Sequence, residues 1–166
     1  MNTPDYKSPP KEVLSFDYVH ILLHQSKLEV QLRKEKRLEI GGGNTVLVVD
    51  DDPILLSIAS SMLTRLGFTS LETTDSVEAV EVFKQHSKSI CCVLCDLMMP
   101  QMNGWETLKA LRRLAPGLPV MLSSGYVQTE LFEGDHPELP QVFLGKPYSL
   151  NELREAILKA LEKSIV

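Results

Sequence analysis

Four groups of polar residues each follow a short apolar segment and could do chemistry together. They are Asp50-Asp51, Asp96, Ser124 and Lys146. Three carboxylates brought together repel one another and raise one another's pKa unless a cation lies among them, and carboxylate oxygens suit Mg²⁺. A lysine ammonium and a serine hydroxyl beside the metal would complete a pocket for a phosphoryl group. This combination favours phosphoryl transfer to a carboxylate, with Asp96 as the nucleophile.

Asp96 ends the most informative stretch of the chain. Apolar residues from Cys91 to Cys95 lead into this carboxylate, and a Met-Pro and an Asn-Gly pair follow before a helix begins. A short apolar run bounded by turn residues is typical of a strand buried on both faces of a parallel sheet. An isolated aspartate could also cap a turn. Capping does not explain Lys146, which lies between an apolar strand and Pro147, so we favour a site.

The elements that must position these residues alternate along the chain as strands and helices. Continuously apolar segments predict strands, and apolar stripes at helical spacing predict the helices between them. The expected strands are 45–49, 68–72, 91–95, 120–123 and 141–144. This alternation predicts an α/β fold with a (βα)₅ doubly wound, parallel five-stranded sheet. The carboxyl ends of its strands meet at one edge, where open α/β sheets form their sites.

Local signals place several helix ends. Asp52 followed by Pro53 predicts an N-cap with proline at the first helical position. Ser149 and Glu152 predict a capping box that opens the last helix. The first of these helices is expected to bury one apolar stripe, made of Leu55, Ile58, Ala59, Met62, Leu63 and Leu66.

The segment between the fourth and fifth strands departs from a regular helix. It is interrupted by Gly134, Pro137 and Pro140. Proline inside a helix costs about 3 kcal/mol or more and biases the preceding residue away from helical angles. We therefore expect a short helix over about 128–133, followed by an irregular loop through 139.

Composition divides the chain into three parts. Residues 1–40 are expected to be an N-terminal extension or linker, polar and proline-bearing at its start and permissive for helix later. Residues 41–44, Gly-Gly-Gly-Asn, predict a flexible Gly-rich joint. Residues 45–166 then form the folded domain.

Composition and charge exclude several function classes. The chain has 166 residues, 43% of them hydrophobic and 23% charged, as in a soluble globular protein. Its net charge of −5 argues against a direct electrostatic contact with nucleic acid. No apolar run approaches the roughly 18 residues of a membrane span, and the start is not a signal peptide. We expect a cytoplasmic location and no membrane partner.

Cys92 and Cys95 form a C-x-x-C pattern that can indicate redox chemistry or metal binding. On a strand, a rise of about 3.3 Å per residue places their Cα atoms about 10 Å apart, beyond the reach of a disulfide. We therefore expect small buried hydrophobic side chains.

The motifs as a set resemble the receiver domain of two-component response regulators, over about residues 45–164. They are the acidic pair Asp50-Asp51, Asp96 followed by x-x-M-P-x-M-x-G, Ser124-Gly125, and Lys146-Pro147. The two runs around Ser124 and Lys146 look particularly like receivers attached to hybrid sensor kinases. The resemblance implies a flavodoxin-like receiver fold in which Asp96 accepts phosphate from a phosphohistidine on a partner kinase.

The resemblance also implies the metal ligands. Asp51, Asp96 and the backbone carbonyl of Met98 would bind Mg²⁺, with Asp50 acting mainly through water. No other cofactor is implied.

A switch is implied as well. Ser124 and Lys146 would hold the phosphoryl oxygens, and Phe143 lies where the family places an aromatic residue that turns inward as the Ser/Thr side chain moves toward the phosphate. Phenylalanine lacks a tyrosine hydroxyl, so a polar signal from that side chain is excluded. The chain ends with the last receiver helix, so its effect is expected to pass through a partner.

The leading hypothesis is therefore a phospho-accepting signalling module and not an enzyme. Its expected partners are a histidine kinase or phosphotransfer protein and a downstream protein. One alternative is the carboxyl-terminal receiver fragment of a hybrid sensor histidine kinase, with residues 1–40 as leftover kinase or linker. No ATP-binding glycine box or phosphoacceptor histidine box precedes Gly41, so this chain is not expected to be a kinase itself. A second is an aspartyl-phosphate phosphatase, but such enzymes carry a second aspartate where this chain has Met98.

Overall fold

The computed structural model describes residues 24, 25, 27, 39–125 and 137–162. The chain divides into two compact units, Met1–Lys36 and Arg37–Val166. In the first unit, the described residues His24, Gln25 and Lys27 are helical. The second unit contains the sheet and every residue of the predicted site. None of the helices in the described ranges is long and apolar enough to cross a membrane.

Five parallel strands form one sheet in the order β2-β1-β3-β4-β5. They are β1 (Thr45–Val49), β2 (Thr69–Thr73), β3 (Ile90–Asp96), β4 (Val120–Ser124) and β5 (Val142–Gly145). The predicted (βα)₅ doubly wound parallel sheet is confirmed. The chain runs outward from β1 to β2 and then in the other direction from β3 to β5, so the order reverses between β1 and β3. A crevice at the carboxyl ends of the strands is expected at such a point.

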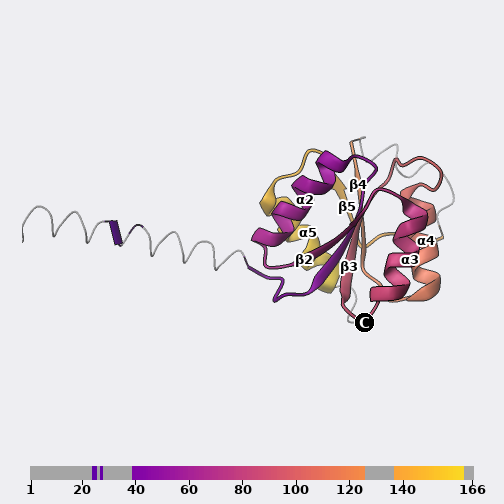
Figure 1. Cartoon of the computed structure of the whole chain (residues 1–166), viewed down its shortest axis with the longest axis horizontal. Coiled ribbons are helices and arrows are strands. Elements are labelled where there is room, and N and C mark those ends of the chain that lie inside the picture. The colour runs from indigo at the N-terminus through magenta and orange to yellow at the C-terminus, as the bar shows by residue number, and fades with distance from the viewer. Residues whose placement is uncertain (1–23, 26, 28–38, 126–136, 163–166) are drawn as a thin grey trace, which may run out of the picture. The chain divides into compact units, whose positions relative to one another are not determined.

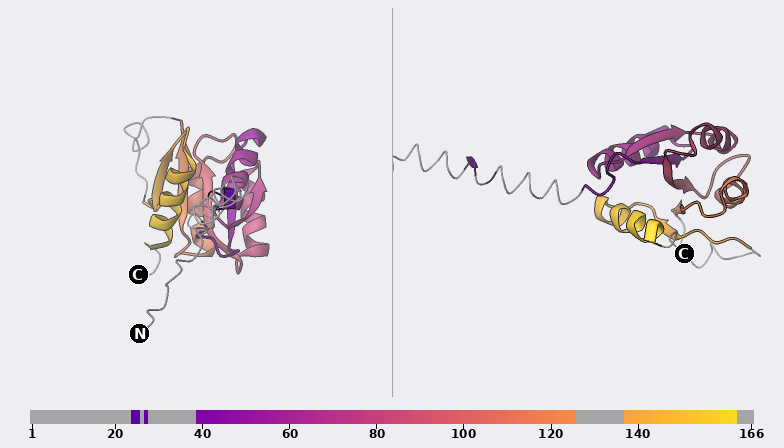
Figure 2. Two further views of the ribbon diagram at one scale, coloured as in Figure 1. Left: turned by 90° about the vertical axis from the view of Figure 1, so that its left-hand side faces the viewer. Right: turned by 90° about the horizontal axis from the view of Figure 1, so that it is seen from below.

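Four helices within the described residues cover the two faces of the sheet. They are α2 (Pro53–Arg65), α3 (Ser76–His86), α4 (Gly104–Leu114) and α5 (Leu150–Glu162). In Figure 1, α2 and α5 lie on one side of the sheet and α3 and α4 on the other. Figure 2 shows the same separation from below.

The strands are apolar at successive positions because helices cover both faces. Val46 and Val48 of β1 join the core under α2 and α5, whereas Leu47 and Val49 join the core under α3 and α4. All four side chains are at most 2% exposed. Burial on both faces holds β1 between β2 and β3 inside the sheet, and the residues that follow it are thereby fixed at the carboxyl edge.

Both predicted caps are present. The Asp52 side chain accepts a hydrogen bond from the Ile54 N–H at 2.8 Å, with Pro53 opening α2. The Ser149 N–H donates to Glu152 Oε2 at 2.7 Å, and the Glu152 N–H donates to Ser149 Oγ at 3.3 Å.

The apolar stripe predicted for α2 was partly wrong. Ile58 is 46% exposed, and Leu56, which the stripe omitted, is only 5% exposed. The buried residues of α2 are Leu56, Ala59 and Leu63. The helix therefore faces the sheet along this narrower row, which leaves Ile58 at its outer border.

The glycine segment expected to be a flexible joint is instead fixed to the loop after α2. The N–H groups of Ile40 and Gly41 each donate to the Leu66 carbonyl at 2.8 Å, and the Gly43 N–H donates to the Gly67 carbonyl at 2.9 Å. A Cβ on Gly41 would lie 2.4 Å from the carbonyl carbon of Gly67, so only glycine fits there. The segment is thus part of the folded unit, while the domain boundary before residue 41 stays a prediction.

The connection between β4 and β5 is held by α4. The helix expected over 128–133 lies outside the described residues, and 137–141 are not helical. The Arg112 guanidinium donates to the Leu139 carbonyl at 2.8 Å and to Gln141 Oε1 at 2.7 Å. Gln141 Oε1 also accepts the Val120 N–H at 2.8 Å. These contacts fix the start of β5 against the start of β4.

Candidate functional site

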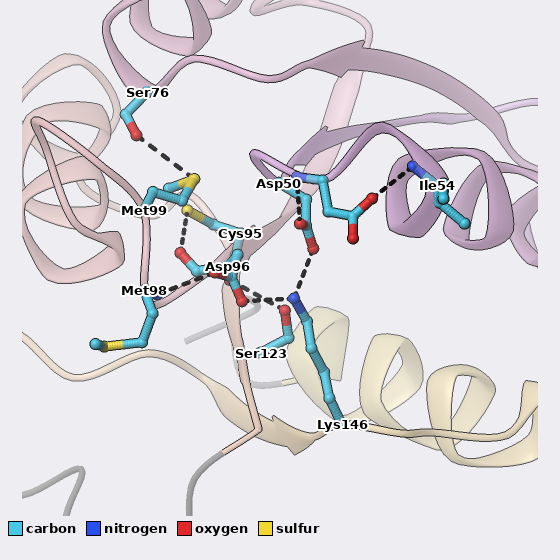
Figure 3. Close-up of polar contacts among 10 residues, drawn as sticks. Asp50, Ile54, Ser76, Cys95, Asp96, Met98, Met99, Ser123 and Lys146 are labelled. Atoms are coloured by element: carbon cyan, nitrogen blue, oxygen red, sulfur yellow. Dashed lines mark hydrogen bonds and ion pairs between the residues drawn. The ribbon is translucent and has the colours of Figure 1, made fainter.

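The ends of two strands at the carboxyl edge of the sheet bring the predicted acidic residues together, and Figure 3 shows Asp50 and Asp96 among them. Asp50 and Asp51 follow β1, and Asp96 ends β3. One carboxylate oxygen from each of the three lies within 4.8 Å of the others. Asp50 and Asp96 are 6% exposed, whereas Asp51 faces solvent. The cluster is therefore buried on one side and open on the other.

Lys146 reaches into this cluster from the end of β5. Its Nζ lies 2.6 Å from Asp50 Oδ2 and 2.6 Å from Asp96 Oδ1. Burial alone would lower the pKa of Lys146, but the hydrogen bonds and charges of the two carboxylates outweigh it, so the pKa lies above its ordinary value. The charged ammonium thus relieves part of the repulsion that the sequence attributed to a metal alone.

Backbone N–H groups orient the two buried carboxylates. The Met98 N–H donates to Asp96 Oδ2 at 3.0 Å, and the Asp52 N–H donates to Asp50 Oδ1 at 3.1 Å. Both oxygens of Asp96 therefore have a partner, since Oδ1 accepts from Lys146. The Met98 side chain is 59% exposed, and its backbone lies beside the acidic cluster.

The acidic cluster with its lysine fits a hard divalent cation. Three carboxylates and one ammonium leave an excess of two negative charges in a cluster that is open at Asp51. A small dication with oxygen ligands that keeps some of its water suits such a site, and Mg²⁺ has these properties. Asp50, Asp51 and Asp96 are the residues that would hold it.

The loop after Asp96 is held by two contacts that the sequence did not reveal. The Gly104 N–H donates to the Leu97 carbonyl at 3.0 Å, and a Cβ on Gly104 would lie 2.6 Å from the Asp96 carbonyl oxygen. The Ser76 hydroxyl of α3 donates to the Met102 carbonyl at 2.7 Å. In the sequence, the only indication that Ser76 has a structural role was its position directly after Asp75, the N-cap of α3.

Ser124 and Phe143 lie on the two strands nearest Lys146. Ser124 ends β4 and is 3% exposed. Its backbone carbonyl accepts a hydrogen bond from the backbone N–H of Lys146 at 2.7 Å. Phe143 lies in β5, where its ring meets the ring of Trp105 at a centroid distance of 5.5 Å and an interplanar angle of 64°. Sequence reasoning missed this aromatic pair, because Trp105 and Phe143 are far apart in the chain.

The cysteines are structural, as expected. Cys92 and Cys95 are free thiols with no exposed surface. Burial raises the pKa of the Cys95 thiol well above its ordinary value, and its Sγ donates to the Asp96 carbonyl at 3.3 Å. Neither thiol is a nucleophile at neutral pH.

Comparison with known proteins identifies relatives of this chain. Sensor kinase CckA from Brucella abortus (strain 2308) is 30% identical over 129 residues, which are 78% of this chain and 14% of that kinase. The chain therefore spans about one seventh of this relative. A crystal structure of the receiver domain from hybrid histidine kinase CckA superposes with a TM-score of 0.60 at 29% identity, covering 71% of this chain and 99% of that domain.

A second solved structure and a family model lead to the same family. A response regulator receiver domain protein from Clostridium thermocellum has a TM-score of 0.67 at 25% identity, covering 72% of this chain and 95% of that one. The family model for the response regulator receiver domain matches residues 46–158. The chain belongs to this receiver domain family, whose members accept phosphate in two-component signalling.

Proposed function

We propose that Asp96 is the residue that accepts the phosphoryl group, and that the donor is a phosphohistidine of a histidine kinase or phosphotransfer protein. The observation that carries this proposal is the cluster of three carboxylates within 4.8 Å, with Lys146 bridging Asp50 and Asp96. Among the three, Asp96 lies at the end of the central strand β3 and has its carboxylate oriented by the Met98 N–H. Family membership supports the acceptor role.

The proposed step forms a bond from an Asp96 carboxylate oxygen to phosphorus as the nitrogen–phosphorus bond of phosphohistidine breaks and the imidazole keeps the electron pair. Mg²⁺, held by Asp50, Asp51, Asp96 and the Met98 carbonyl, would neutralise charge on the phosphoryl oxygens. Lys146 is within 2.6 Å of Asp96 Oδ1 and so can follow the incoming phosphoryl oxygens. Ser124, beside Lys146 on β4, would donate its hydroxyl to the same group.

We propose a signalling role and not turnover of external phosphate esters. An aspartyl-phosphate phosphatase needs a general acid two residues after its nucleophile, and Met98 has no proton to give. The hybrid-kinase relatives favour a phosphorelay in which a partner protein recognises the phosphorylated domain. The chain being a receiver segment of a longer kinase stays an alternative, and the cytoplasmic location stays a prediction.

The test compares Asp96→Asn with Asp52→Asn. Asp52 is in the same region but caps α2, and asparagine is an equally good cap. After incubation with acetyl phosphate and Mg²⁺, intact mass should show one acid-labile phosphate on the wild type and on Asp52→Asn, and none on Asp96→Asn. Undiminished phosphate uptake by Asp96→Asn would overturn the assignment.

A profile of transfer from the host's purified histidine kinases would then identify the donor. The expected result is rapid transfer from one kinase or phosphotransfer protein and slow transfer from the others, all of it lost in Asp96→Asn.

A further inference from the structure

The edge-to-face contact between Trp105 and Phe143 joins two elements that both end at the acidic cluster. Trp105 lies in the first turn of α4, and Phe143 lies in β5. Their ring centroids are 5.5 Å apart with an interplanar angle of 64°, a favourable arrangement for two aromatic rings. Both side chains are half-buried. The contact thus spans the outer part of the core, next to the site and not within it.

Each ring is linked to the reacting residue by a short run of chain. Trp105 directly follows Gly104, whose Cα approaches the Asp96 backbone so closely that a Cβ would lie 2.6 Å from the Asp96 carbonyl oxygen. Phe143 lies three residues before Lys146, whose Nζ is 2.6 Å from Asp96 Oδ1. A change at Asp96 therefore reaches the two rings by different routes, one through α4 and one through β5.

β5 is the element better placed to move. It lies at the edge of the sheet and is paired with β4 alone among the described strands. Its carboxyl end is held by the ion pairs of Lys146 with Asp50 and Asp96. A phosphoryl group on Asp96 brings new anionic oxygens to that ammonium, which changes the restraint on the end of β5.

We propose that Trp105 is a positioning residue that holds the Phe143 ring in the unphosphorylated arrangement of β5, and that phosphorylation of Asp96 alters this contact. The inference rests on the proposed function. Trp105 then contributes to the balance between the unphosphorylated and the phosphorylated arrangements of β5. A contact present equally in both states would shift nothing, so the effect depends on the ring pair being weaker after phosphorylation.

The single tryptophan of the chain makes the contact directly observable. Adding beryllofluoride and Mg²⁺ to the full-length protein should change the intensity or wavelength of Trp105 emission. In Phe143→Leu this change should be largely lost, because the ring that Trp105 meets has been removed. In Asp96→Asn no change is expected, because beryllofluoride needs that carboxylate.

Variants then measure how the contact between Trp105 and Phe143 is coupled to beryllofluoride binding, without relying on fluorescence. The concentration of beryllofluoride at half-saturation is read from its bound ¹⁹F NMR signal in the presence of Mg²⁺. Trp105→Leu and Phe143→Leu should each lower it by about two- to tenfold, the range expected for loss of one aromatic pair. The double variant should match the single ones, and Trp105→Tyr, which restores a ring, should return within about twofold of the wild type.

Leu114→Ala is the matched control, since Leu114 is 46% exposed at the other end of α4 and should leave the half-saturation unchanged. Loss of both acetyl phosphate labelling and beryllofluoride binding in the wild type would refute the proposed function. Normal labelling with unchanged Trp105 emission, or with strictly additive variants, would refute the role of Trp105 alone. If Trp105→Leu fails to fold, wild-type emission and Phe143→Leu still decide.

Discussion

Lys146 is the counter-ion of two buried carboxylates in this state, since its ammonium is 2.6 Å from an oxygen of Asp50 and from one of Asp96. The sequence predicted that these residues would meet, because each follows a parallel strand. It did not predict that Lys146 would pair with Asp50, because side-chain pairing depends on how far the fifth strand brings the lysine across the sheet edge. This lysine and any bound cation therefore both relieve the repulsion among the carboxylates.

Lys146→Ala should destabilise the protein most when no divalent cation is present. Two carboxylates then stay buried without a counter-ion, and we expect a loss of about 2–4 kcal/mol in the free energy of unfolding in EDTA. Saturating Mg²⁺ should recover more stability in the variant than in the wild type, because binding to the folded state is linked to unfolding. Urea denaturation in EDTA and in Mg²⁺ measures both effects.

Lys84→Ala is the control for this prediction. Lys84 also lies 2.6 Å from a carboxylate oxygen, that of Glu81, but this pair is on the surface with side chains 48% and 59% exposed. Its loss should change stability little under either condition. Equal losses for the two lysine variants would contradict the counter-ion role of Lys146.

At the scale of elements, the start of α4 determines where the loop after Asp96 lies. Gly104 begins the helix against the backbone of Asp96 and Leu97, and Asn103 caps it by accepting the Glu106 N–H at 3.0 Å. The sequence placed this helix within one residue, as well as the strands before and after it, because apolar runs and cap residues are local signals. It could not predict the closeness of Gly104 to Asp96, which depends on how α4 packs on β3.

Gly104→Ala should disturb both stability and phosphate uptake. Its Cβ would lie 2.6 Å from the Asp96 carbonyl oxygen and 2.8 Å from the Leu97 Cα, so the backbone must move. We expect a loss of about 1–3 kcal/mol in the free energy of unfolding and slower labelling by acetyl phosphate. Gly117→Ala is the control, because its Cβ would meet nothing within 4 Å. Similar stability losses for both variants would show that the contact at Gly104 is unimportant.

Arg112 connects α4 with the entry to β5 and offers a second test at this scale. Arg112→Ala removes its hydrogen bonds to the Leu139 carbonyl and Gln141 Oε1, which should cost about 1–2 kcal/mol. Amide hydrogen exchange should accelerate at Val120, whose N–H is bonded to the same Gln141 oxygen. The neighbouring Arg113 is exposed, and Arg113→Ala should leave exchange at Val120 unchanged. Exchange that is unaltered in Arg112→Ala would contradict the anchoring role.

At the scale of the whole molecule, Ile40 and the glycine segment are bonded to the folded unit. Ile40 packs against the core under α2 and α5, and its N–H donates a hydrogen bond to the Leu66 carbonyl. The sequence indicated a flexible joint because consecutive glycines lack side chains that could pack. Glycine also permits the close approach of Gly41 to Gly67, so the composition alone could not distinguish a joint from a tightly packed turn.

Two truncated chains test this boundary. A chain starting at Arg37 keeps Ile40 and the bonds from Gly41 and Gly43, whereas a chain starting at Thr45 loses all of them. We expect the shorter chain to be about 2 kcal/mol less stable in urea denaturation, from the loss of one buried apolar side chain and several hydrogen bonds. Equal stability of the two chains would mean that the segment contributes nothing to the fold.

The two ion pairs of Lys146 also place a condition on folding. They join Lys146 to Asp50, which lies 96 positions earlier in the chain, and to Asp96, which lies 50 positions earlier. Both of these long loops must close before the acidic cluster has its counter-ion. During synthesis, Asp50 and Asp96 leave the ribosome before Lys146, so a nascent chain that lacks the last strand has the carboxylates without this ammonium. The acidic cluster therefore gains its ammonium partner only when β5 docks beside β4.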